Sequence, residues 1–264
     1  SCEMEDGLAR WRFADARPEG WKLMGLSGWR DQRRTGHIMD DPATRHNGPF
    51  REIQLGRTAR DGRACLMTDS VMVIDALVTP EECTTLRGAA DAWCEQSAWN
   101  GEALRRIECH TRGINLDGET HALVHTILAR ALWNIECLEP ALAAELFPRT
   151  RSRHLCDLQF EFSGREPMLN RYTTGGMFAP HQDSHALTIL VPLSTPGTDF
   201  SGGGTAFWSE SITVDSSVAS NFPPSLVMTP VAGTALFWRG HVTHAGLPVK
   251  SGMRHVFVAS FNLS

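Results

Sequence analysis

Two histidines and one aspartate in the C-terminal half of the chain have the residue types of a mononuclear metal site. His181 and Asp183 are separated by one residue in the stretch LNRYTTGGMFAPHQD (169–183), and His244 stands in the later stretch FWRGHVTHAG (237–246). Side chains two apart on a β-strand point to the same face, so His181 and Asp183 can reach one ion together, with His244 supplied by a distant strand. Two imidazoles and one carboxylate leave other coordination positions open, which predicts chemistry at the metal.

Other interpretations of these histidines stay open at this point. The chain has 11 histidines, so an H-x-D tripeptide alone is compatible with an incidental surface pair. Zinc is the chemical alternative, although no two cysteines have the C-x-x-C spacing of structural zinc sites. His185 would share the face of Asp183 if the strand continues, and is interpreted as a pocket-lining residue or a support for a ligand. His241 would face away from His244 and is interpreted as structural or surface-exposed.

Four motifs in this part of the chain occur in an order that resembles a known family. Tyr172 and a Gly-Gly pair precede the H-x-D stretch, GGGTAF (202–207) lies between the histidines, and Arg254 follows ten residues after His244. From about Val71 to its end, nearly three quarters of its length, the chain is similar to the prolyl 4-hydroxylase-like branch of the Fe(II)/2-oxoglutarate dioxygenases. The resemblance implies that the two histidines and the aspartate named above are the catalytic Fe(II) ligands.

The resemblance also implies residues that bind the cosubstrate 2-oxoglutarate. Arg254 takes the role of the cation that holds the far carboxylate, for which a guanidinium fork is suited. The alternative for Arg254 is an exposed arginine at a strand end. Tyr172, the only tyrosine of the chain, is expected to line the cosubstrate pocket, or else to be an ordinary packed aromatic residue. Thr188 is a weaker candidate for a further hydrogen bond to the cosubstrate.

The implied reaction is the oxidation of an unactivated C–H bond with Fe(II), 2-oxoglutarate and O2, with ascorbate as a stimulant. Hydroxylation, desaturation and oxidative cyclisation all stay open, whereas the retained Asp183 argues against halogenation. We expect an amino acid or other small metabolite as substrate, because Arg254 stands where collagen-type members carry Lys and Phe257 or Phe261 lies near an expected Trp. The alternatives are a peptidyl-prolyl 4-hydroxylase and, in another class, a non-catalytic barrel binding module; nucleic-acid demethylation is a lesser option.

Composition sets the broad class of the protein. A chain of 264 residues with 42% hydrophobic and 21% charged residues can form one all-β barrel or sandwich domain. The net charge of −5 gives no general attraction to nucleic acid or to anionic membranes, and no apolar run approaches the roughly 18 residues of a membrane span. The oligomeric state stays open.

The cysteines and the first residues indicate a cellular compartment. Seven cysteines are scattered along the chain, an odd number that favours reduced thiols over a disulfide framework. We therefore expect a cytoplasmic or other reducing intracellular location. The chain begins at Ser1 rather than Met and has no signal-peptide character, so a trimmed N-terminus is also expected.

Periodicity and turn signals divide the chain into two parts. Residues 1–68 have no sustained periodicity, apart from a short strand expected within 48–56, and are expected to form an N-terminal extension that acts as a lid or a support. The catalytic domain is expected over residues 69–264. Within it, a strand is predicted over 71–74, a helix beginning at Thr79-Pro80-Glu81-Glu82, and a second helix ending before Pro140.

From residue 155 onward the sequence consists of short alternating apolar runs separated by Gly, Pro, Ser and Asn. Many short strands after two helices predict an α+β fold: a double-stranded β-helix, the jelly-roll or cupin-like barrel, with supporting N-terminal helices. The mouth of such a barrel would hold the iron.

Overall fold

The computed structural model describes residues 2–5, 8–12, 50–55, 70–97, 101–109, 118–138, 143–144, 146–147, 155, 159–209, 219 and 221–263. Most of segment 1–68, including its tryptophan side chains, lies outside the described residues, as do Cys65 and Cys156.

The main sheet is antiparallel and has ten strands. Eight of them follow one another in the order β1 (Cys2–Glu5), β2 (Leu8–Arg12), β6 (Gln159–Phe162), β16 (Arg254–Leu263), β9 (Leu187–Pro192), β13 (Ala235–Trp238), β4 (Ser70–Ile74) and β3 (Phe50–Gln54). In addition, β7 (Met168–Tyr172) pairs with β16, and β5 (Leu104–Glu108) pairs with β7. The strand predicted within 48–56 is thus confirmed as β3, and β1, β2 and β3 extend the sheet at its two ends.

A smaller antiparallel sheet faces the main one. Its strands follow the order β12 (Leu226–Met228), β11 (Thr205–Trp208), β14 (Thr243–Gly246) and β8 (Phe178–His181), and a separate pair is formed by β10 (Phe200–Gly202) and β15 (Val249–Gly252). Along the chain, β7, β9, β13 and β16 of the main sheet alternate with β8, β11 and β14 of the small sheet. This winding is the double-stranded β-helix, and the predicted α+β fold class is confirmed.

Alternating residues of the main strands enter two different hydrophobic cores, because successive side chains of a strand point to opposite faces. On β16, Val256 packs into the core between the two sheets, and Phe257 packs into the core beneath the helices. The two faces of this strand therefore enter different cores. Because Arg254 lies on the same face as Val256, it points into the barrel.

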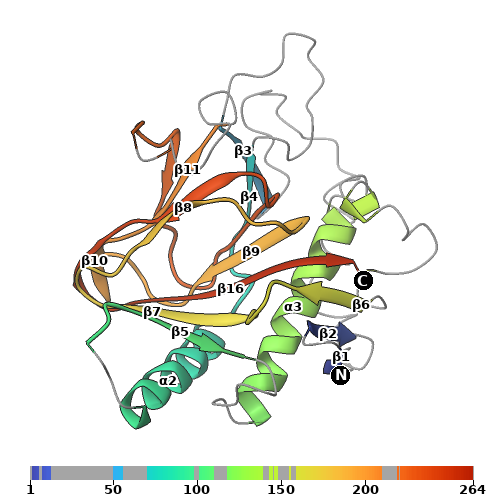
Figure 1. Ribbon diagram of the computed structural model, residues 1–264, viewed down its shortest axis with the longest axis horizontal. Coiled ribbons are helices and arrows are strands. Elements are labelled where there is room, and N and C mark those ends of the chain that lie inside the picture. The colour runs from blue at the N-terminus through green and yellow to red at the C-terminus, as the bar shows by residue number, and fades with distance from the viewer. Residues whose placement is uncertain are drawn as a thin grey trace, which may run out of the picture.

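The helices cover the outer face of the main sheet (Figure 1). Helix α2 (Pro80–Gln96) begins as predicted: Thr79 Oγ1 accepts the N–H of Glu82, and the Glu82 carboxylate accepts the N–H of Thr79. Helix α3 (Gly118–Leu138) is tied to α2 by an ion pair of 2.7 Å between Arg130 and Glu82. Among the described residues, no helix is long and apolar enough to cross a membrane.

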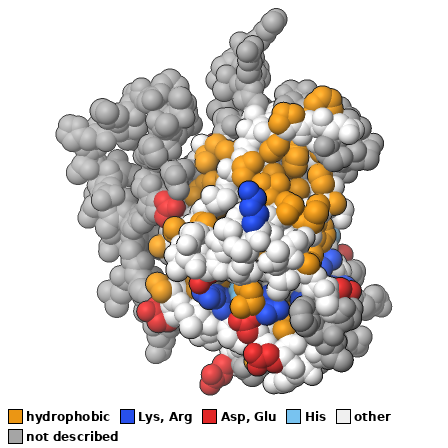
Figure 2. Space-filling model, turned by 90° about the vertical axis from the view of Figure 1, so that its left-hand side faces the viewer, with side chains coloured by type: hydrophobic (Ala, Val, Ile, Leu, Met, Phe, Trp, Pro, Cys, Tyr) orange, Lys and Arg blue, Asp and Glu red, His pale blue; other side chains and the backbone are white. Residues whose placement is uncertain are grey.

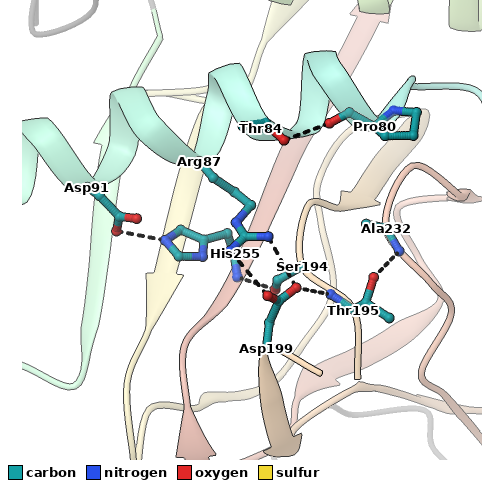
Figure 3. A network of polar contacts seen from close by, with 9 residues as sticks. All are labelled: Pro80, Thr84, Arg87, Asp91, Ser194, Thr195, Asp199, Ala232 and His255. Atoms are coloured by element: carbon teal, nitrogen blue, oxygen red, sulfur yellow. Dashed lines mark hydrogen bonds and ion pairs between the residues drawn. The ribbon is translucent and has the colours of Figure 1, made fainter. Parts of the chain in front are cut away.

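Polar contacts also fix α2 to the back of the barrel (Figure 3). Asp91 accepts a hydrogen bond of 2.9 Å from Nε2 of His255, which lies on the outer face of β16 next to Arg254. Arg87 donates two hydrogen bonds to Asp199 near the start of β10. The helix is therefore positioned against the strand that carries the predicted cosubstrate anchor.

Candidate metal centre

The structure brings His181, Asp183 and His244 together at one end of the barrel. Their ligand atoms all lie within 4.8 Å of one another. His181 and His244 are cross-strand partners in β8 and β14, which places the two rings side by side. The Asp183 carboxylate lies 3.7 Å from Nε2 of His181 and 3.5 Å from Nε2 of His244.

One detail differs from the sequence-based expectation. Strand β8 ends at His181, so Asp183 does not share a strand with it. Asp183 is instead fixed because its N–H donates to the Gly240 carbonyl at 2.7 Å. A Cβ at Gly240 would lie 2.6 Å from the Asp183 carbonyl oxygen and 2.0 Å from that of His185, so this turn needs glycine.

Both imidazoles are oriented by the backbone two residues before them. Nδ1 of His181 lies 2.9 Å from the Ala179 carbonyl, and Nδ1 of His244 lies 3.0 Å from that of Val242. A carbonyl accepts only, so each Nδ1 carries the proton and each Nε2 presents a lone pair. Burial also lowers the pKa of His244 to about 4, against the opposing effect of Asp183, which keeps this ring neutral at physiological pH.

These groups fit a divalent first-row ion. Two neutral imidazole nitrogens and one carboxylate converge, and the protons of both rings are directed away from the point of convergence. Imidazole and carboxylate together suit Fe(II), and three protein ligands leave positions open for other molecules. The Asp183 carboxylate is itself held by the Thr188 hydroxyl, which donates to Oδ2 at 2.5 Å.

A pocket with about 480 Å³ of empty space, its open mouth included, adjoins the three residues. Arg254 lines it, is 3% exposed, and donates a hydrogen bond of 3.0 Å from Nη2 to Thr205. Its guanidinium carbon lies 5.2 Å from the ring centroid of Tyr172, which also lines the pocket. Gly203, at φ +64, brings the Gly-rich loop close, since a Cβ there would lie 3.2 Å from Cδ of Arg254.

Other residues singled out from the sequence lie elsewhere. Thr188 is fully buried behind Asp183 and is absent from the pocket lining, so the structure gives no support to its predicted contact with a cosubstrate. His185 and His241 also lie outside the lining. Cys83, Cys94 and Cys109 are free and buried, and burial raises the pKa of Cys83 to about 11.

Sequence reasoning missed three polar residues of the pocket: Arg106, Glu166 and Asn170. Arg106 lies on β5, directly opposite Asn170 of β7. Glu166 precedes β7 and is 7% exposed; burial, and then the nearby Asp183, raises its pKa to about 7. No motif pointed to these residues, because their place in the pocket depends on the pairing of β5 with β7.

Comparisons with known proteins were consistent with this geometry. Residues 167–262, which include the three converging residues and Arg254, match the family model described as 2OG-Fe(II) oxygenase superfamily. The match confirms the resemblance drawn from the motifs.

Among curated proteins, the chain is similar to procollagen-lysine,2-oxoglutarate 5-dioxygenase 2 of Homo sapiens and of Mus musculus. The identity is 33% over 82 residues in each case, which is 30% of this chain and 9% of the relative. The chain therefore matches less than a tenth of the length of these relatives.

Three solved structures illustrate more distant likenesses. The viral collagen prolyl hydroxylase of Paramecium Bursaria Chlorella virus-1, as its 2OG complex, has a TM-score of 0.49 at 16% identity, over 77% of this chain and 98% of that one. A prolyl-4-hydroxylase of Pseudomonas putida gives 0.44 at 13%, over 74% and 92%. HygX of Streptomyces hygroscopicus, with nickel and 2-oxoglutarate bound, gives 0.47 at 14%, over 74% and 83%.

Proposed function

We propose that this chain, whose residues 167–262 belong to the 2OG-Fe(II) oxygenase superfamily, is an Fe(II)- and 2-oxoglutarate-dependent dioxygenase. One observation carries the proposal: two imidazole Nε2 atoms and one carboxylate converge at a pocket that the buried Arg254 also lines. The reaction would oxidise an unactivated C–H bond by hydroxylation, desaturation or oxidative cyclisation.

Three groups of pocket residues would have different roles in the reaction. His181, Asp183 and His244 would hold Fe(II), which together with 2-oxoglutarate and O2 supplies the oxidising power. Arg254, cross-strand from Tyr172 and hydrogen-bonded to Thr205, would bind the far carboxylate of 2-oxoglutarate. Buried apolar walls such as Trp238 and Leu190 would exclude water from the reacting groups. The protein thereby orients one substrate C–H bond toward the metal.

We propose an amino acid or other small metabolite as the substrate, since Arg106, Glu166 and Asn170 add polar groups to the lining of the pocket. A peptidyl substrate is the second candidate. Hydrophobic side chains gather on the face shown in Figure 2, and Met177, which is 49% exposed, directly precedes the pocket residue Phe178. The curated relatives are named as acting on procollagen lysine, which also favours this candidate.

The same proposal extends to the two parts of the chain. Residues 69–264 would form the catalytic domain, and residues 1–68 a lid or a support for it. Strand β3 pairs with β4, and β2 pairs with β6, which supports a packing role for at least these segments. A lid predicts that a chain beginning near residue 69 retains metal and 2-oxoglutarate binding but loses substrate oxidation.

The test is cosubstrate turnover. Protein loaded with Fe(II) is supplied with 2-oxoglutarate, O2 and a library of metabolites and peptides, and succinate is measured together with product mass. The expected result is substrate-stimulated succinate formation with gain of one oxygen atom or loss of two hydrogen atoms. If no succinate forms, and neither Fe(II) nor 2-oxoglutarate binds, the chain is a non-catalytic binding module and the proposal is wrong.

A further inference from the structure

The pocket contains a cation with no hydrogen-bonding partner in the described part of the chain. Arg106, at the centre of β5, has a buried Nε that forms no hydrogen bond, and its guanidinium carbon lies 5.3 Å from the ring centroid of Phe178. The neighbouring Arg105, on the other face of the strand, lies over Trp93 outside the pocket and pairs with Glu102. Arg106 therefore lines the pocket and forms no ion pair within hydrogen-bonding distance among the described residues.

The same pocket contains an acidic side chain, Glu166. Glu166 is nine-tenths buried, and its Oε2 accepts the N–H of Ser260. No ion pair joins Glu166 to Arg106 among the described residues, although both line the pocket. Asn170 stands cross-strand from Arg106, and its buried Oδ1 has no hydrogen-bonding partner. Arg106, Glu166 and Asn170 can thus each form a further hydrogen bond to a ligand in the pocket.

The charges of the pocket indicate what would satisfy these groups. In the proposed function, the divalent metal and Arg254 together carry three positive charges, which the dianionic cosubstrate and Asp183 balance. Arg106 and Glu166 remain, one positive and one negative, in a largely buried site where unpaired charges are strongly unfavourable. A ligand with both a carboxylate and an ammonium group would neutralise both at once.

We propose that Arg106 and Glu166 form the recognition site for a free, zwitterionic α-amino acid substrate. The Arg106 guanidinium would bind the α-carboxylate, and the Glu166 carboxylate would accept the α-ammonium, with Asn170 Oδ1 as a further acceptor for its N–H groups. This inference rests on the proposed function and narrows its substrate class. An amino acid inside a peptide has neither charge, so it would leave both groups unpaired.

The first arm of the test uses the wild-type chain. Protein loaded with Mn(II) as a redox-inactive probe and saturated with 2-oxoglutarate is titrated calorimetrically with the L-amino acids, their N-acetyl derivatives and their C-terminal amides. At least one free amino acid is expected to bind, with each blocked derivative weaker by on the order of 100-fold. Equal binding of free and blocked forms would overturn the proposal.

The second arm assigns each charge to its residue. In Arg106→Gln, the free acid and its amide should bind within a few-fold of each other, while discrimination against the N-acetyl form persists. In Glu166→Gln, the opposite pattern is expected. Arg105→Gln is the matched control on the same strand and should keep both discriminations. Interchanged or unchanged patterns in the two pocket variants would contradict the assignment.

The outcome also separates this inference from the proposed function. If a peptide supports succinate formation and no free amino acid binds, the chain is still a dioxygenase and the amino-acid site is wrong. Loss of 2-oxoglutarate binding in Arg106→Gln, with Arg254→Gln unaffected, would instead make Arg106 the cosubstrate anchor and likewise overturn the inference.

Discussion

The Thr188 hydroxyl donates a hydrogen bond of 2.5 Å to Oδ2 of Asp183 from a fully buried position on β9. Thr188 Oγ1 also lies 3.2 Å from Oγ of Ser260 on the neighbouring β16. The Thr188 hydroxyl thus lies between the Asp183 carboxylate and the Ser260 hydroxyl. The main sheet therefore fixes the orientation of a carboxylate that lies beyond the end of its own strand.

Removing this hydroxyl should weaken metal binding without unfolding the protein. In Thr188→Val, Asp183 loses its buried donor, and loss of such a supporting hydrogen bond typically lowers metal affinity about 10- to 100-fold. The measurement is Fe(II) affinity by anaerobic calorimetry. Thr188→Ser keeps the hydroxyl and should bind nearly as well as wild type. Wild-type affinity in the valine variant would show that Asp183 needs no such support.

Alanine at any one of His181, Asp183 or His244 should abolish Fe(II) binding and succinate formation. Each would supply one of only three protein ligands, so its loss removes a large part of the coordination sphere. His241→Ala is the control, because His241 lies outside the pocket lining, and it should retain both properties. Iron affinity that survives in His244→Ala would remove this residue from the ligand set.

Arg254→Ala should raise the Michaelis constant for 2-oxoglutarate by about 100-fold or more and leave Fe(II) affinity nearly unchanged. The reason is that a buried carboxylate would lose its charged partner, a loss on the order of 3 kcal/mol or more. Arg254→Lys should recover part of the effect, since an ammonium group lacks the two-pronged geometry. An unchanged Michaelis constant would point to another anchor.

Glu166 should make the metal-free protein less stable as pH rises. Burial, and then Asp183, raises its pKa to about 7 in the folded state, compared with about 4.5 in the unfolded chain. Between these values the folded state binds more protons, so the free energy of unfolding falls with rising pH. Glu166→Gln removes this effect and should be more stable than wild type at about pH 8, by on the order of 3 kcal/mol, with a much smaller difference at about pH 5.

Denaturant unfolding of both metal-free proteins at the two pH values checks this prediction. Because the other titrating groups are common to both proteins, the difference between them isolates Glu166. A difference that does not grow with pH would mean that the Glu166 carboxylate is better solvated or better paired than its surroundings indicate.

Much of this architecture could be predicted from local sequence. The capping box at Thr79 fixes the start of α2 through contacts within one turn, and the alternation from Arg254 to Ala259 gives both faces of β16. The converging residues and Arg254 could be selected because the H-x-D stretch, the later histidine and the arginine ten residues after it are visible in the sequence itself. Their roles as metal ligands and cosubstrate anchor stay predictions.

What could not be predicted depends on long-range pairing. Arg106 belongs to LRRIE, in which nothing distinguishes it from Arg105 until β5 pairs with β7. Glu166 reads as an ordinary turn residue, and no local pattern indicates that it is buried or that its carboxylate accepts the N–H of Ser260 on β16. Asp183 was expected on the strand of His181. Its backbone is held instead by a hydrogen bond to Gly240, a residue far away in the sequence, which local patterns do not indicate.

Strand β16 presents Arg254 to the pocket on one face and His255 to Asp91 of α2 on the other. The docking of the helix and the binding of a cosubstrate therefore act on the same short length of backbone from opposite sides. Coupling between two such events is reciprocal: if helix docking raises cosubstrate affinity, cosubstrate binding stabilises helix docking by the same free energy. A substitution at Asp91, which lies outside the pocket lining, would then change cosubstrate affinity.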